Sequence, residues 1–117
     1  LCQAFHNDLL VTSERVARYR LPLLVEGLPD AYHGLFEVHP RDPAHQVLPK
    51  TIETPSLVVW GAQDRVLLPD HEGVWCHDLP NHHRVNLENV GHMVPEEAPE
   101  VLAELAQDFW AVVTNSH

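Results

Sequence analysis

The stretch LVVWGAQDRVLLPD, residues 57–70, decides the fold. Residues 56–60 form a short apolar run rich in β-branched side chains, which predicts a strand buried on both faces, as in a parallel sheet. Gly61 ends the run, and Asp64 follows it in the turn. Because open parallel sheets bind their ligands at the carboxyl ends of their strands, Asp64 occupies a position where such sheets build active sites.

The second half of the chain alternates between strand and helix patterns. Residues 69–79 predict a helix, residues 83–87 a second strand, and residues 99–114 an amphipathic helix. The apolar side of that last helix is expected to consist of Val101, Leu102, Leu105, Phe109 and Val112. The order strand, helix, strand, helix predicts an α/β fold with a parallel, right-handed βαβ unit and a closing helix.

The first half consists of short helical patterns separated by prolines. Thr12 or Ser13 is expected to cap a helix that fails at the next proline, and residues 30–38 predict a second short helix. The dense prolines that follow are typical of a linker. We therefore divide the chain into residues 1–50, which hold short helices and a linker, and residues 51–117, which hold the α/β unit.

Composition narrows the class of protein. The 117 residues are 44% hydrophobic and carry a formal net charge of −10, with scattered basic residues. This predicts a folded domain and argues against nucleic acid or an anionic membrane surface as a partner. The two cysteines, read as free thiols, and the lack of an apolar run near the ~20 residues of a membrane span favour a cytoplasmic protein. The sequence opens on Leu1 and not on methionine, so we expect a fragment or a processed product.

A second motif, NVGHMVPEEAPE at residues 89–100, supplies a candidate partner for Asp64. His92 follows a glycine turn after the second strand, and the carboxyl ends of parallel strands lie at the same edge of a sheet. An aspartate that accepts the Nδ1 proton of a histidine fixes the tautomer of the ring and stabilises the imidazolium. We therefore predict that a carboxylate oxygen of Asp64 lies within roughly 2.6 to 3.2 Å of Nδ1 of His92.

Together these motifs resemble the C-terminal third of the α/β-hydrolase fold family: an apolar strand, WGxxD, a helix ending in LPN, a second strand, and GH followed by ExP. The resemblance implies that Asp64 is the acid and His92 the base of a nucleophile-acid-histidine triad. It also implies a mostly parallel sheet with further strands elsewhere, preceded by the end of a helical cap in residues 1–50. The chain has no GxSxG motif and its serines do not resemble a nucleophile elbow, so the nucleophile is expected before Leu1.

Three functions remain open from the sequence. The first is hydrolysis of a small ester-like substrate, with a serine nucleophile and with His92 acting as base and then as acid. The second is an epoxide hydrolase or dehalogenase type of enzyme with an aspartate nucleophile, in which the histidine activates water. The third is a non-catalytic fragment or binding module that keeps the pair for structural reasons.

Other residues receive smaller roles. Met93 and Val94 directly follow the histidine and are expected to contact a small-molecule substrate, whereas Trp60 is expected to pack in the core. Glu97 is interpreted as a structural acid at a helix start, and Glu96 receives no role. The ten histidines lack the HxxxH spacing of a helical zinc site, so we expect no metal and no cofactor. An unpaired sheet edge is expected to promote self-association.

Overall fold

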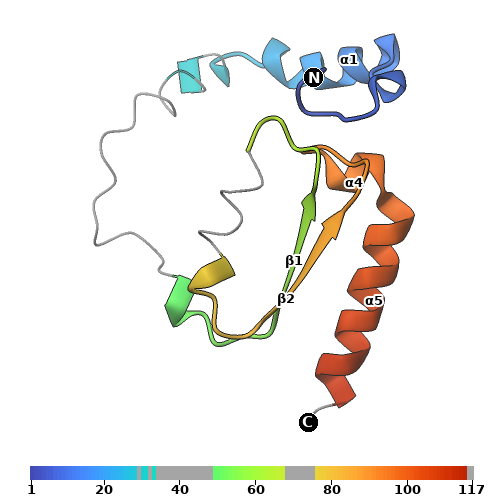
Figure 1. The fold of residues 1–117 in the computed structure, drawn as a ribbon. Helices are drawn as coiled ribbons and strands as arrows, with labels where there is room; N and C mark the ends of the chain where they lie inside the picture. Colours follow the sequence, from blue (N-terminus) through green and yellow to red (C-terminus); the bar gives the residue numbers. More distant parts are fainter. Residues whose placement is uncertain (29, 32, 34–48, 68–75, 116–117) are drawn as a thin grey trace.

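A pair of parallel strands forms the centre of the fold (Figure 1). The computed structural model describes residues 1–28, 30, 31, 33, 49–67 and 76–115. β1 spans Ser56–Gly61 and β2 spans His82–Leu87, and the first residues of the two strands lie opposite each other. The predicted parallel pair is therefore confirmed, with each strand one residue longer than expected. β1 is mostly half-buried and not buried on both faces, because β2 is its only strand partner among the described residues.

The described part of the sheet leaves both outer edges without a strand partner. The expected helix over residues 69–79 would connect β1 to β2, but most of it lies outside the described residues. The same holds for most of the helix expected over residues 30–38 and for most of the linker that follows. Self-association through an unpaired edge stays a prediction.

Outside the sheet, the elements that lie wholly within the described residues are, in chain order, a 3₁₀ turn Asp8–Leu10, α1 Ser13–Arg20, a 3₁₀ turn Leu21–Leu24, a 3₁₀ turn Pro49–Thr51, α4 Val94–Glu97 and α5 Pro99–Asn115. The hydroxyl of Thr12 accepts the N–H of Arg15 at 3.2 Å, which confirms Thr12 as the residue that caps α1. After Arg20 the chain tightens into the 3₁₀ turn that contains Pro22, because proline cannot donate the next helical hydrogen bond. No helix in the described ranges combines the length and apolar character needed to cross a membrane.

α5 lies alongside the two strands (Figure 1). Its half-buried apolar positions recur every three or four residues and comprise Leu102, Leu105, Phe109 and Val113. Val101 and Val112, predicted for this face, are 44% and 66% exposed. At 3.6 residues per turn both lie at the margin of the stripe, and Val113 continues it in place of Val112.

The first residues of the chain pack onto the loop that follows β2. Phe5 is fully buried, and the carbonyl of its neighbour Ala4 accepts the backbone N–H groups of His92 at 2.8 Å and Met93 at 3.2 Å. In the part of the chain that the structure describes, the other buried apolar residues are Cys76, Val90 and Val94. The described core therefore joins the N-terminal segment to the end of the sheet, where the predicted site lies.

Gly61 lies where the end of β1 touches the backbone of the loop after β2. A Cβ on Gly61 would lie 2.0 Å from the carbonyl oxygen of Gly91 and 2.5 Å from that of Val90. Because no side-chain rotation relieves an overlap with backbone, we expect Gly61→Ala to lower the free energy of unfolding by about 3 kcal/mol, measured by urea denaturation.

The control for this substitution is Gly27→Ala. A Cβ on Gly27 meets no atom within 4 Å, so only backbone strain at its φ of 78° remains. That strain is expected to cost about 1 to 2 kcal/mol. If Gly61→Ala unfolds at the same urea concentration as the wild type, the close approach of the two backbones is wrong.

Candidate active site

Asp64 lies in the turn that follows β1, and both its backbone and its side chain are held there. Its N–H donates to the carbonyl of Gly61 at 3.1 Å. Its Oδ1 accepts the N–H groups of Val66 at 2.8 Å and Leu67 at 2.9 Å, as short acidic side chains do in turns. The residue is only 6% exposed. These contacts fix the carboxylate in one orientation.

His92 lies in the loop after β2, and its Nδ1 is 2.9 Å from Oδ2 of Asp64. This distance confirms the predicted contact between the two strand ends. An ionised carboxylate only accepts hydrogen bonds, so Nδ1 carries the proton and Nε2 is the nitrogen that can take one. The side chain of His92 is 34% exposed, whereas that of Asp64 is 4% exposed. The arrangement combines a buried acid with an accessible imidazole.

Backbone hydrogen bonds fasten together the two loops that carry the pair. The N–H of Ala62 donates to the carbonyl of Leu87 at 2.9 Å, and the N–H of Gln63 donates to the carbonyl of Val90 at 2.9 Å. The side-chain Oε1 of Gln63 in turn accepts the N–H of Val90 at 3.2 Å. Asn89 turns the chain with a φ of 61°, a left-handed conformation that asparagine tolerates. The spacing between Asp64 and His92 is thus set by the backbone.

Opposing effects act on the pKa of Asp64. Burial raises it, because it removes water from the charged carboxylate. The hydrogen bond with His92 and the N–H bonds from Leu67 and Val66 lower it, and together they outweigh burial, so the pKa of Asp64 lies below its ordinary value. Asp64 is therefore ionised at neutral pH, which is the state in which a carboxylate orients and stabilises a histidine.

A cavity of about 280 Å³ adjoins the pair. Asp64 and His92 line it at one place, and the rest of its lining is formed by Gly61 and by the apolar residues Val59, Trp60, Leu67, Val94, Pro95 and Leu102. A mostly apolar cavity with a few polar groups is the usual form of a small-molecule site. Val94 borders the cavity, whereas Met93 is not part of its lining. Trp60, expected in the core, lines it as well, and its buried Nε1 has no hydrogen-bond partner among the described residues.

A second histidine-aspartate pair shows what distinguishes the first. Nδ1 of His77 lies 2.8 Å from Oδ1 of Asp78, but these side chains are 85% and 56% exposed. Water screens such a pair and competes for its hydrogen bonds. The contact between Asp64 and His92 differs in its burial, in the backbone donors on Asp64 and in the adjoining cavity.

Comparison with known proteins identifies the surrounding fold. No family model matches the chain. It is 33% identical over 110 residues to the uncharacterized hydrolase YugF of Bacillus subtilis, covering 93% of this chain and 40% of that protein. It is 32% identical over 111 residues to the monoacylglycerol lipase ABHD6 of Mus musculus, covering 85% of this chain and 33% of the lipase. Over most of its length the chain resembles members of the α/β-hydrolase family.

A solved structure is also similar to this chain. The crystal structure of a membrane phospholipase A, described as a bacterial virulence factor, matches with a TM-score of 0.54 and 40% sequence identity. The match covers 58% of this chain and 22% of the phospholipase chain. The chain spans less than half the length of the curated relatives named above.

Glu97 lies at the end of α4, two residues before α5 begins. Its carboxylate accepts the backbone N–H groups of Gly91, His6 and Asn7 at 2.8, 2.8 and 3.1 Å. The expected structural acid is thus present, and it accepts backbone N–H groups from the loop after β2 and from the first residues of the chain.

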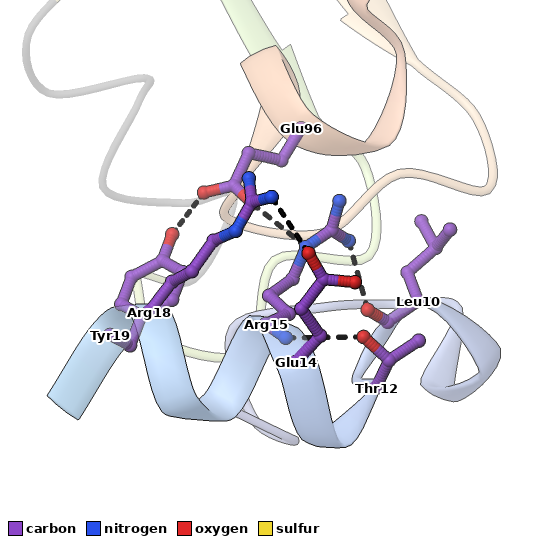
Figure 2. Close-up of polar contacts among 7 residues, drawn as sticks. All are labelled: Leu10, Thr12, Glu14, Arg15, Arg18, Tyr19 and Glu96. Carbon is purple, nitrogen blue, oxygen red and sulfur yellow. Dashed lines mark hydrogen bonds and ion pairs between the residues drawn. The ribbon is translucent and has the colours of Figure 1, made fainter. Parts of the chain in front are cut away.

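Sequence reasoning missed Glu96, which joins α4 to α1 (Figure 2). Its Oε2 lies 3.1 Å from Nε of Arg15, and its Oε1 accepts the hydroxyl of Tyr19. The Arg15 guanidinium also donates to the carbonyl of Leu10 at 2.9 Å and lies 5.1 Å from the centre of the Phe5 ring. Arg15 and Tyr19 are four residues apart on α1, a spacing that indicates a shared face but does not reveal a partner so distant in sequence.

The contact with Glu96 also affects the ionisation of Tyr19. The hydrogen bond to the Glu96 carboxylate raises the pKa of Tyr19 above its ordinary value, with smaller contributions from burial and from the charge of Glu96. Tyr19 therefore stays protonated and keeps donating to Glu96 throughout the neutral range.

Within the described parts of the chain, no three histidine, cysteine, aspartate or glutamate side chains are grouped so that they could hold a metal ion. The absence of a metal and of a cofactor stays a prediction. The chemical groups that the site does offer are a carboxylate, an imidazole and an apolar cavity.

Proposed function

We propose that this chain supplies the acid and the base of a nucleophile-acid-histidine triad in a hydrolase of small esters. Asp64 is the acid and His92 the base. The observation that carries the proposal is the 2.9 Å contact between Nδ1 of His92 and the buried Asp64 carboxylate at the edge of an apolar cavity. The hydrolase and lipase names of the relatives support the same reaction class.

The nucleophile in this proposal is a serine in a part of the enzyme outside these 117 residues. The sequence has no GxSxG motif, and it spans 40% of the length of YugF. We use the term parent hydrolase for this chain together with the part that bears the nucleophile. Residues 1–50 would then contribute the end of a cap, and residues 51–117 the C-terminal part of the catalytic domain.

The reaction follows from the protonation states of the pair. Nε2 of His92 takes the hydroxyl proton as the serine oxygen attacks the ester carbonyl, and Asp64 stabilises the imidazolium that forms. The imidazolium then gives this proton to the alkoxide that leaves, which yields an acyl-serine and an alcohol. Water attacks the acyl group with His92 again as base, and the serine leaves with the proton as the carboxylic acid departs.

The favoured substrate is a carboxylic ester with a small apolar acyl group. Two relatives are named as a monoacylglycerol lipase and a membrane phospholipase A, and both names describe the hydrolysis of lipid esters. The cavity beside His92 is mostly apolar, which suits an acyl chain better than a charged group.

The experiment that tests the proposal combines turnover with covalent trapping. The parent hydrolase is expected to hydrolyse nitrophenyl acetate and butyrate, and a fluorophosphonate is expected to label one serine and abolish this activity. The 117 residues alone serve as the blank, because without a nucleophile and oxyanion donors little transition-state stabilisation remains.

Other outcomes of this experiment point to the alternatives. A parent hydrolase that resists the fluorophosphonate but opens epoxides or dehalogenates haloacids has an aspartate nucleophile, and the ester proposal is then wrong. A folded parent protein without turnover of any of these substrates is a binding module.

A further inference from the structure

The carboxylate of Glu97 joins the histidine loop to the N-terminal segment. Its Oε1 accepts the N–H of Gly91 at 2.8 Å, directly before His92. Its Oε2 accepts the N–H groups of His6 at 2.8 Å and Asn7 at 3.1 Å. Donors from two segments separated by most of the chain therefore converge on one side chain. Each of these N–H groups would need another acceptor if the carboxylate were absent.

The two segments that Glu97 joins are in direct backbone contact. A Cβ on Gly91 would lie 2.6 Å from the backbone nitrogen of His6 and 2.8 Å from the carbonyl oxygen of Ala4. It would also lie 2.8 Å from Oε1 of Glu97. Only glycine allows the loop, the segment and the carboxylate to meet at this distance.

The N-terminal segment also contacts the backbone of His92. Its backbone N–H donates to the carbonyl of Ala4 at 2.8 Å, and the next residue in the N-terminal segment, Phe5, is fully buried. The backbone of His92 is thus held by a segment that is anchored by Phe5 and tied to the loop by Glu97. The ring is held separately, through Nδ1 and Asp64.

We infer that Glu97 is a positioning residue for His92, an inference that rests on the proposed function. Its carboxylate keeps the N-terminal segment on the histidine loop and so keeps Nε2 of His92 in line with the nucleophile. Both oxygens are needed, because Oε1 accepts the N–H of Gly91 in the histidine loop and Oε2 accepts the N–H of His6 in the N-terminal segment. Loss of the carboxylate releases three backbone N–H groups and lets the loop shift. A displacement of about 1 Å in a catalytic group can lower the rate about 10²-fold.

The test uses Glu97→Ala and Glu97→Gln in the parent hydrolase. For Glu97→Ala we expect kcat on nitrophenyl acetate to fall about 10²-fold with KM unchanged. We also expect loss of the deshielded proton NMR signal of His92 Nδ1–H, which reports its hydrogen bond to Asp64. Glu97→Gln keeps one acceptor oxygen, so its kcat and NMR signal should be intermediate. The matched control is Glu100→Ala, an exposed acid in the first turn of α5.

Three outcomes would overturn the inference, and they differ from one another. If Glu97→Ala lowers the unfolding temperature but keeps wild-type kcat and the Nδ1–H signal, Glu97 stabilises the fold without positioning His92. If Glu97→Ala does not fold, Glu97→Gln decides, and a wild-type kcat in this variant rejects the inference. If His92→Ala keeps full activity, the proposed function is wrong and the positioning role falls with it.

Discussion

Replacing His92 by alanine should lower kcat of the parent hydrolase on its ester substrate by about 10⁴- to 10⁶-fold. The serine then has no base, because Nε2 of His92 is the atom proposed to accept its proton. Asp64 cannot substitute, since it is 6% exposed and its Oδ1 is already occupied by the N–H groups of Val66 and Leu67. Initial rates and fluorophosphonate labelling both measure the loss.

The control for this prediction is His77→Ala. His77 is another histidine whose Nδ1 lies at hydrogen-bond distance from a carboxylate, but its side chain is 85% exposed. We expect this variant to keep the kcat of the wild type. Equal activity of His92→Ala and the wild type would remove His92 from the mechanism, whereas equal losses in the two variants would indicate a general effect of losing a histidine.

The strands and the contact between Asp64 and His92 could be predicted because local signals determine them. The apolar run before Gly61 indicates a strand, and a parallel pair brings its carboxyl ends to one edge. Asp64 and His92 therefore lie close together because each follows the carboxyl end of one of these two strands. The stripe of α5 was predicted less well, because a one-residue difference at its end, Val113 in place of Val112, changes which side chain faces inward.

The supports of the site could not be predicted, because they join distant parts of the chain. Glu96 contacts Arg15 and Tyr19, and Glu97 contacts backbone N–H groups, which have no side-chain signature in a sequence. The residue types at positions 96 and 97 are identical and adjacent, yet their carboxylates point to different segments. Composition and periodicity carry no information about which distant segment each of these carboxylates contacts.

Asp64→Asn should lower kcat of the parent hydrolase by about 10⁴-fold while leaving the fold nearly intact. The amide oxygen of asparagine can still accept the N–H groups of Val66 and Leu67, which hold this turn in the wild type. Its NH₂ group would then face Nδ1 of His92 and donate to it. The ring responds by moving its proton to Nε2, and in this tautomer Nε2 cannot accept the proton of the nucleophile.

The matched control for this last prediction is Asp78→Asn, which makes the same change in the exposed pair with His77 and should leave kcat unchanged. The thermal unfolding temperature distinguishes a variant that has lost its fold from one that is folded but holds His92 in the wrong tautomer. Asp64→Asn with a wild-type unfolding temperature and a wild-type kcat would reduce the 2.9 Å contact to a structural hydrogen bond. A low kcat with an unchanged unfolding temperature assigns the effect to the proton on the ring. Because the pKa of Asp64 in the wild type lies below its ordinary value, this carboxylate stays ionised through the neutral range, so an acid limb of the pH profile of kcat/KM in that range should not arise from Asp64.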